Sequence, residues 1–217
     1  MIMAWDYVIF DMDGVLSNTE PIHFQVWRKT LASRGIDLDF EKYKPCIGST
    51  LINLKKVMLE QYGVDLWGDE QLIPDYMKEN TGTMQRDGVE GISGVPEMLK
   101  KLTDRGVHMA VASSSPMQDI ELVLTKLDIK KYFEVICTGE DVPSPKPAPD
   151  IFLKAARLLH ADPAQCLVVE DSRNGSRAAK AAGMYCIGFV SPASGDQDLS
   201  AADRIIYHYS QMQGVLY

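Results

Sequence analysis

Short apolar runs alternate with amphipathic stretches from Gly88 onward, and this alternation constrains the fold more than any other feature of the chain. Runs of β-preferring apolar residues predict strands, and apolar residues spaced three or four apart predict helices. The expected strands are 107–112, 134–138, 166–170, 184–190 and 204–207, and the expected helices are 95–104, 117–127, 150–159 and 172–182. Strands and helices that alternate at this spacing form a mostly parallel sheet with helices on both faces. The sequence therefore predicts an α/β core of the Rossmann-like type.

One more strand is expected before this region, at Tyr7–Phe10, and it runs directly into Asp11 and Asp13. The residues after it show helical patterns at 20–34, 50–62 and 70–84, with no strand-like run between them. We therefore expect residues 1–17 and 88–217 to form the α/β core, and residues 18–87 to form a helical domain inserted after the first strand.

The charge and composition of the chain argue against two classes of partner. The 217 residues include 22 Lys and Arg and 30 Asp and Glu, a net charge of −8, whereas nucleic-acid binding needs clustered cations. No apolar run approaches the roughly 18 residues that cross a bilayer, and no signal peptide is visible. The four cysteines have no paired spacing, which favours buried free thiols in a reducing compartment. We expect a cytoplasmic protein, a monomer or weak dimer, without nucleic-acid or membrane partners.

Polar residues follow the expected strands at the edge where a parallel sheet binds its ligands. They are Asp11, Asp13, Ser113, Ser114, Lys146, Glu170 and Asp171. Each residue type also has an ordinary explanation, because serine caps helices, aspartate before glycine makes turns, and acidic residues favour helix N-termini. A lysine in a proline-rich loop is usually just solvated. The convergence of all of them on one edge favours a functional site.

Carboxylates, a hydroxyl and one lysine are the groups that a Mg²⁺ ion beside a phosphoryl group requires. Mg²⁺ takes a few carboxylate oxygens together with water and phosphate oxygens, and Asp11 and Asp171 come from different strands to supply them. The other phosphoryl oxygens need a hydroxyl, main-chain N–H groups and a cation, and Ser113 and Lys146 are placed for this. We therefore expect Mg²⁺ as the cofactor and a small phosphorylated metabolite as the partner.

These residues also carry a family resemblance. Asp11-Met12-Asp13-Gly14, Ser113 after an apolar strand, Lys146-Pro147-Ala148-Pro149-Asp150 and Glu170-Asp171-Ser172 resemble, in the same order, the four motifs of the haloacid dehalogenase-like hydrolases. The helical insertion resembles the small α-helical cap of that family. Residues 15–23 and 144–152 resemble its β-phosphoglucomutase and sugar-phosphate phosphatase branch.

The resemblance implies a role for each matched residue. Asp11 would be the nucleophile that forms an aspartyl-phosphate, and Asp13 the general acid and then the general base. Ser113 and Lys146 would hold the transferring phosphoryl group. Metal ligands would be Asp11, the main-chain carbonyl of Asp13, Asp171 and, directly or through water, Glu170. Contacts with the substrate would come from Gly14, Thr19, His23, Ser49, Ser114 and Lys146, although His23 also fits the pattern of a half-buried structural histidine.

Three functions remain open on the sequence. The first is a Mg²⁺-dependent phosphatase for a small phosphorylated metabolite, a sugar phosphate in particular. The second is a phosphosugar mutase, but such mutases carry an arginine near Ser49, where this chain has only Lys55 and Lys56 a turn later. The third is a phosphorylatable signalling or binding module. Asn18, where the family usually has aspartate, is a departure at the expected hinge of the cap.

Overall fold

A single six-stranded sheet forms the centre of the protein. The structure, a computed structural model, describes residues 5–48 and 50–212. The strand order is β3-β2-β1-β4-β5-β6, and every neighbouring pair is parallel. The strands are β1 (Tyr7–Phe10), β2 (His108–Ser113), β3 (Val135–Thr138), β4 (Cys166–Glu170), β5 (Tyr185–Phe189) and β6 (Arg204–Ile206). The predicted α/β class with a mostly parallel sheet is confirmed.

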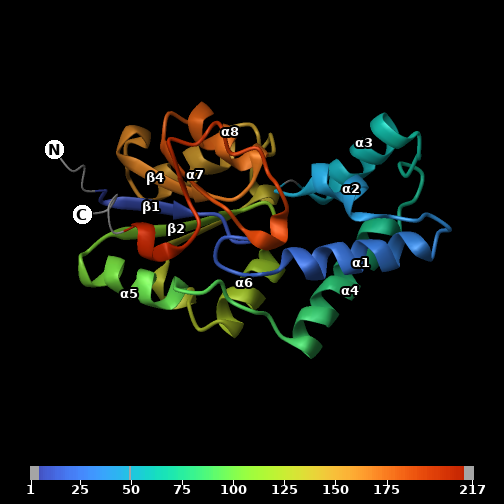
Figure 1. The fold of residues 1–217 in the computed structure, drawn as a ribbon, viewed down its shortest axis with the longest axis horizontal. Coiled ribbons are helices and arrows are strands. Elements are labelled where there is room, and N and C mark those ends of the chain that lie inside the picture. The colour runs from blue at the N-terminus through green and yellow to red at the C-terminus, as the bar shows by residue number, and fades with distance from the viewer. Residues whose placement is uncertain (1–4, 49, 213–217) are drawn as a thin grey trace.

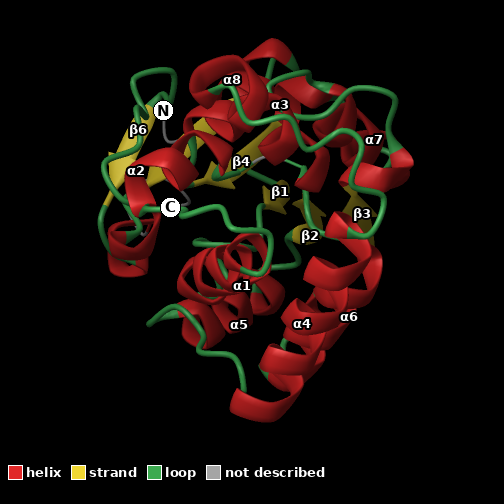
Figure 2. Cartoon of the chain, turned by 90° about the vertical axis from the view of Figure 1, so that its right-hand side faces the viewer, coloured by secondary structure: helices red, strands yellow, loops and turns green. Residues whose placement is uncertain are grey.

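Helices cover both faces of the sheet because successive strand residues point to opposite sides. Val8 and Phe10 of β1 pack into a cluster with α5 (Val95–Asp104) and α6 (Met117–Lys126). Ile9, between them, packs on the other face with α7 (Asp150–Leu158) and α8 (Arg173–Ala181). Figure 1 shows these two helical layers below and above the strands, and Figure 2 shows them after a turn of 90° that brings the right-hand side of Figure 1 to the front.

Strand β1 lies in the middle of the sheet, with β2 on one side and β4 on the other. Phe10, its last residue, is opposite Val111 of β2 and Val169 of β4. The carboxyl ends of these three strands therefore adjoin, and whatever follows each of them in the chain is brought to the same place.

The segment between β1 and α5 has a hydrophobic core of its own, built around Trp27, Leu54 and Tyr76. The rings of Trp27 and Tyr76 stack with centroids 3.9 Å apart. Its helices are α1 (Glu20–Ala32), α2 (Phe40–Tyr43), α3 (Leu51–Tyr62) and α4 (Leu72–Asp87). We call residues 18–87 the helical segment; Figure 1 shows its helices beyond the ends of the strands.

Local sequence explains where the helices of this segment begin and end. Pro21 stands in the first turn of α1, where its missing N–H costs nothing. Gly63 ends α3 in the left-handed conformation, with φ of 67°. The Asp39 carboxylate accepts from the main-chain N–H of Lys42 and caps α2, a four-residue helix too short for periodicity to predict. The other expected helices and strands are present, with ends shifted by a few residues.

The chain enters and leaves the helical segment side by side. Ser17 forms an antiparallel bridge with Gly91, and the main-chain N–H of Asn18 donates to the carbonyl of Glu90 at 2.8 Å. The Asn18 amide also donates to the Glu90 carboxylate at 3.1 Å. Among the described residues, no helix combines the length and apolar character needed to cross a bilayer.

Candidate active site

Asp11 and Asp13 follow the carboxyl end of β1 and therefore lie at the edge of the sheet. The main-chain N–H of Asp11 donates to the carbonyl of Val169 at 3.0 Å, so the ladder to β4 extends one residue past the strand. The chain then turns at Gly14, whose φ is 81°. A Cβ at this position would lie 1.9 Å from Oδ2 of Asp171. Glycine is therefore required here both by the backbone conformation and by the close approach of Asp171.

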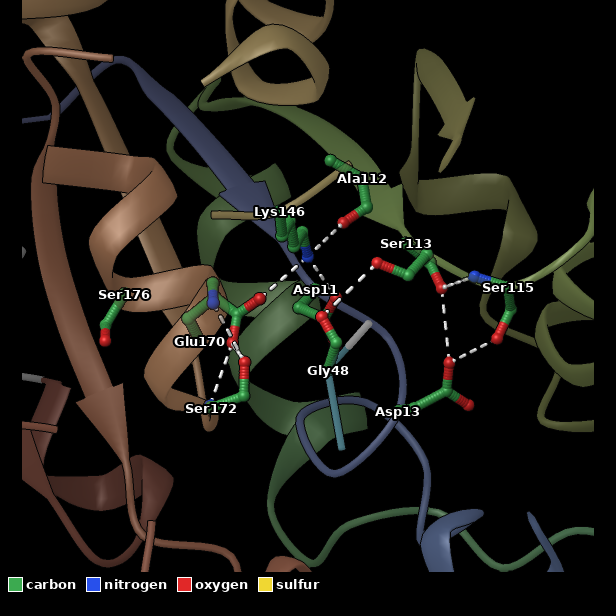
Figure 3. Close-up of polar contacts among 12 residues, drawn as sticks. Asp11, Asp13, Gly48, Ala112, Ser113, Ser115, Lys146, Glu170, Ser172 and Ser176 are labelled. Atoms are coloured by element: carbon green, nitrogen blue, oxygen red, sulfur yellow. Dashed lines mark hydrogen bonds and ion pairs between the residues drawn. The ribbon is translucent and has the colours of Figure 1, made fainter. Parts of the chain in front are cut away.

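The ammonium of Lys146 joins the ends of three strands (Figure 3). It donates to Oδ1 of Asp11 at 2.6 Å, to Oε1 of Glu170 at 2.7 Å and to the carbonyl of Ala112 at 3.0 Å. Lys146 is 3% exposed. Burial lowers the pKa of this lysine, but the charges and hydrogen bonds of Asp11 and Glu170 outweigh it and raise the pKa above its ordinary value. The site therefore contains a permanent buried cation beside Asp11.

Asp13 has a different environment. Its Oδ2 accepts from the hydroxyls of Ser113 at 3.2 Å and Ser115 at 2.7 Å. Its Oδ1 accepts from the hydroxyl of Thr19 and lies 3.1 Å from Nε2 of His23. Burial would raise the pKa of Asp13, but the hydrogen bond and charge of His23, with the hydroxyls of Thr19 and Ser115, lower it to about 2. Asp13 is therefore ionised in this state.

His23 is a buried, charged partner of Asp13. Its Nδ1 lies 2.7 Å from the hydroxyl of Tyr76, on α4. Burial lowers the pKa of His23, whereas the hydrogen bond and charge of Asp13 raise it to about 9. The pair thus carries one proton on the histidine at neutral pH. His23 thus lies against Asp13, and it is buried as the structural interpretation also expects.

Glu170 and Asp171 close the site from β4. Both oxygens of Glu170 are engaged, because Oε1 accepts from Lys146 while Oε2 accepts from the main-chain N–H and the hydroxyl of Ser172, each at 2.9 Å. The Oδ2 of Asp171 accepts from the hydroxyl of Ser194. Burial raises the pKa of Asp171 well above its ordinary value, and the charges of Glu170 and Asp11 raise it further.

The carboxylates at this edge outnumber the cations. Burial also raises the pKa of Asp11 well above its ordinary value, and Glu170 adds to the effect although Lys146 opposes it. A divalent cation between Asp11 and Asp171 would relieve this repulsion. Within 5–48 and 50–212, no three His, Cys, Asp or Glu side chains group closely enough to hold a metal by themselves. Asp11 and Asp171 supply carboxylate oxygens from two neighbouring strand ends, and such a donor set fits Mg²⁺, which takes one or two carboxylates and keeps several waters.

A cavity of about 50 Å³ is lined by Asp11 and Asp13 on one side and by the helical segment on the other. The helical segment contributes Glu20, His23, Trp27, Tyr43, Cys46, Gly48, Thr50, Leu51, Leu54 and Tyr76 to its wall. Glu20 is 4% exposed and accepts from the hydroxyl of Tyr43 at 2.9 Å. Burial raises the pKa of Glu20 to about 7, although the charge of His23 opposes this. The wall opposite the aspartates is thus acidic and aromatic.

The structure brings most of the predicted site residues together. Gly14 adjoins Asp171. Asp13 is contacted by Thr19, His23 and Ser113. Ser114 lines the cavity, and its hydroxyl donates to the carbonyl of Gly48 at 3.4 Å. Ser49 lies outside the described residues. Lys78 is a further candidate for substrate specificity because it belongs to the helical segment. It lines a separate surface cavity with Asp75 and Glu79. The ammonium of Lys55 donates to the carbonyl of Asp69, away from the site.

Sequence reasoning missed four residues of the site: Glu20, Tyr43, Tyr76 and Ser115. The run Ser113-Ser114-Ser115 was a usable signal for Ser115, since all three follow a strand. Glu20 resembles any acidic residue in the first turn of a helix. Tyr43 and Tyr76 resemble core residues, and most of their surface is indeed core.

Comparisons with a family model, with known sequences and with solved structures all point to the same family. A family model described as haloacid dehalogenase-like hydrolase matches residues 8–189. The fructose-1-phosphate phosphatase YqaB of Escherichia coli (strain K12) is 34% identical over 180 residues, 83% of this chain and 94% of that protein. The bifunctional riboflavin kinase/FMN phosphatase of Arabidopsis thaliana is 32% identical over 203 residues, 92% of this chain; the match spans 52% of that longer protein. The crystal structure of CbbY from Rhodobacter sphaeroides in complex with phosphate has a TM-score of 0.86 at 25% identity, covering 97% of this chain and 99% of that one.

Proposed function

The chain belongs to the haloacid dehalogenase-like hydrolases, and on that basis we propose that it is a Mg²⁺-dependent phosphatase for a small phosphorylated metabolite, a sugar phosphate in particular. One observation carries the proposal. Asp11 and Asp13, two residues apart, have opposite surroundings: a buried ammonium at Asp11, and a histidine with three hydroxyls at Asp13. Two carboxylates with separate environments are suited to separate chemical tasks.

Asp11 is the nucleophile in this proposal. A carboxylate oxygen attacks phosphorus, the bond from phosphorus to the ester oxygen breaks, and an aspartyl-phosphate forms. Lys146, which already contacts Asp11, offsets negative charge on the transferring group. Ser113 lies beside the same space and offers its hydroxyl to a phosphoryl oxygen. Water then attacks the aspartyl-phosphate and releases inorganic phosphate.

Asp13 moves the protons together with His23. The pair holds one proton, so the leaving oxygen takes its proton from the pair, and the ionised pair then accepts a proton from the attacking water. The contact of 3.1 Å between Nε2 of His23 and Oδ1 of Asp13 supports this sharing. Tyr76, on the other nitrogen of the ring, fixes its orientation.

Mg²⁺ would be held by Asp11, Asp171 and the main-chain carbonyl of Asp13, and when bound it would neutralise negative charge at the phosphoryl group. Glu170 would contribute to the ion directly or through water, while its two oxygens accept from Lys146 and Ser172. Its proposed contribution is to position Lys146.

Residues 18–87 are proposed to be a cap that closes over the substrate. The cavity of about 50 Å³ is far smaller than the roughly 300 Å³ at the low end for ligand pockets, so a substrate enters only when the segment moves away. We place the hinges at residues 17–20 and 84–91, where the chain enters and leaves the segment.

The side chains that line this cavity suit a sugar carrying one phosphate better than a sugar carrying two. Glu20 and the hydroxyls of Tyr43 and Tyr76 are hydrogen-bonding partners for sugar hydroxyl groups. Among the described residues that line the cavity, none is lysine or arginine, the side chains that would grip a second phosphate. This favours a phosphatase over a mutase. The Escherichia coli relative is a fructose-1-phosphate phosphatase, which supports the same substrate class.

Phosphate release from a panel of phosphate monoesters in Mg²⁺ tests the proposal. We expect release from one or more sugar phosphates, with fructose 1-phosphate and FMN included in the panel. A parallel assay supplies β-glucose 1-phosphate with glucose 1,6-bisphosphate as primer. If glucose 6-phosphate forms there faster than phosphate is released, the protein is a mutase; if no ester is hydrolysed, the phosphatase assignment is wrong.

A further inference from the structure

A loop that follows β5 reaches the metal-binding end of β4. Its turn, Pro192–Ser194, places the side chain of Ser194 against Asp171, where the hydroxyl donates to Oδ2. Ser194 is 1% exposed and Asp171 2%. The hydrogen bond is thus made out of contact with solvent, between a loop and a carboxylate 23 residues apart in the sequence.

Gly14 confines the same carboxylate from another side. A Cβ on Gly14 would lie 1.9 Å from Oδ2 of Asp171 and 2.7 Å from the hydroxyl oxygen of Ser194. The Asp171 oxygen that accepts from Ser194 therefore lies between the β1 turn and the loop. Holding one carboxylate oxygen in this way fixes the direction of the other, and hydrogen bonds of this kind orient metal ligands in proteins.

The other end of the loop contacts the helical segment. Asp196 forms an ion pair with Lys44, in the 3₁₀ turn Lys44–Cys46 that follows α2. Gly195 lies against Phe40 of α2, close enough that a Cβ there would be 3.2 Å from Cε1 of its ring. One short loop thus contacts the helical segment at Gly195 and Asp196, and the carboxylate of Asp171 at Ser194.

We propose that Ser194 is a positioning residue of the cation site, and that its loop transmits the position of the helical segment to Asp171. With the segment in place, Lys44 holds Asp196, and Ser194 holds Asp171 in its ligating orientation. With the segment displaced, the loop loses Lys44 and Phe40, and Asp171 is less constrained. The cation site is then best formed when the cap is closed. The inference rests on the proposed function, because it takes Asp171 as a ligand of Mg²⁺.

Mg²⁺ binding without any substrate tests the proposal. The thermal unfolding midpoint of the full chain is measured as MgCl₂ is raised, and the rise gives the Mg²⁺ affinity of the folded state. We expect Ser194→Ala to weaken that affinity by about tenfold or more, the lower end for loss of a residue that orients a metal ligand. Ser191→Ala is the matched control. Its hydroxyl lies in the same loop, is buried and has no hydrogen-bond partner among the described residues, so its loss should leave the affinity unchanged.

A second pair of variants tests transmission from the helical segment. Lys44→Ala, which removes the ion pair to Asp196, should also weaken Mg²⁺ binding. Lys42→Ala is the control, because it removes an ion pair of 3.2 Å with Asp39 that lies within the helical segment. This variant should leave Mg²⁺ binding unchanged. A merely structural role for Ser194 predicts a lower unfolding midpoint without Mg²⁺ and an unchanged Mg²⁺ affinity.

The outcomes separate this inference from the proposed function. If the wild-type chain binds Mg²⁺ and Ser194→Ala binds it equally well, the positioning role is wrong while the phosphatase proposal stands. If Lys42→Ala weakens binding as much as Lys44→Ala, the loop does not transmit the position of the segment. If the wild-type chain shows no Mg²⁺-dependent shift, the cation site itself is wrong and the inference falls with it.

Discussion

The ammonium of Lys146 lies between two carboxylates from neighbouring strands, 2.6 Å from Asp11 and 2.7 Å from Glu170. The lysine comes from a loop after β3, whereas the carboxylates follow β1 and end β4. One buried cation thus bridges two strand ends and offsets the charge of Asp11, the proposed nucleophile. Structure and activity should therefore respond together when it is removed.

Replacing Lys146 by methionine should destabilise the protein by about 3–5 kcal/mol, the cost of leaving buried charges without their partner. The side chains are of similar length, so the change removes the charge more than the volume. Urea unfolding gives the difference in free energy. Lys154→Met is the control, because its 2.9 Å pair with Asp141 is partly exposed and should contribute less than about 1 kcal/mol. Equal losses in the two variants would contradict the role given to Lys146.

Replacing Asp11 by asparagine should abolish turnover of p-nitrophenyl phosphate in Mg²⁺. The carboxamide has nearly the same shape as the carboxylate but is a far weaker nucleophile toward phosphorus, so no aspartyl-phosphate forms. Circular dichroism establishes whether the variant is folded. Turnover retained by a folded Asp11→Asn variant would show that another group attacks.

Replacing Asp13 by asparagine should slow turnover by about 10²–10⁴-fold, the usual size of a general acid–base contribution. The amide of asparagine cannot take the proton of the attacking water, so the phosphoenzyme should persist after rapid quenching. Ser115→Ala, which removes the 2.7 Å hydrogen bond to the same carboxylate, should have a much smaller effect. Wild-type turnover in Asp13→Asn would remove the acid–base assignment.

The stability of the protein should fall between about pH 4.5 and pH 7 because of Glu20. Burial raises the pKa of this carboxyl from 4.5 to about 7. The folded state therefore holds the proton more tightly than the unfolded state does, and the stabilisation present below pH 4.5 is lost as the pH rises through 7. The shift corresponds to about 3 kcal/mol. Glu20→Gln should reduce the slope of the free energy of unfolding against pH in this range, and an unchanged slope would assign it to other groups.

Aspartate, the residue usual in the family, should be slightly unfavourable in place of Asn18, at the proposed hinge. Its amide donates to the Glu90 carboxylate at 3.1 Å, and an aspartate would place two like charges there. We expect Asn18→Asp to lower kcat/KM by up to about fivefold, since an exposed pair contributes 1 kcal/mol or less. Adding Glu90→Gln to this variant should restore the wild-type value. Loss without recovery would locate the effect outside this pair.

The sheet was predictable from sequence because hydrophobic periodicity reports burial directly. Strand β1 is apolar at consecutive positions, and Val8 and Ile9 are buried on opposite faces, as expected of a central parallel strand. Because the strands were predicted to be parallel, the topology also predicted that Asp11, Lys146 and Asp171 lie at one edge of the sheet. These residues needed no knowledge of side-chain packing.

The residues that the sequence did not indicate depend on packing between elements. Tyr76 and Lys78 are both on α4, two positions apart, yet Tyr76 reaches His23 while Lys78 lines a surface cavity. Which face of α4 turns inward depends on how α4 packs on α1. Ser194 is a further case, because a serine in an irregular loop has no pattern that indicates its partner. Likewise Asn18 has its partner 72 residues further along the chain.

The adjoining ends of the helical segment have an evolutionary consequence. The main-chain contact of 2.8 Å between Asn18 and Glu90 means that the chain departs from the core and returns to it at one point. The residues between them form a loop whose two ends are held together at the core. The entropic cost of closing such a loop rises only slowly as the loop is lengthened. Residues 18–87 can therefore be exchanged for a segment of different size or architecture without redesign of the strands.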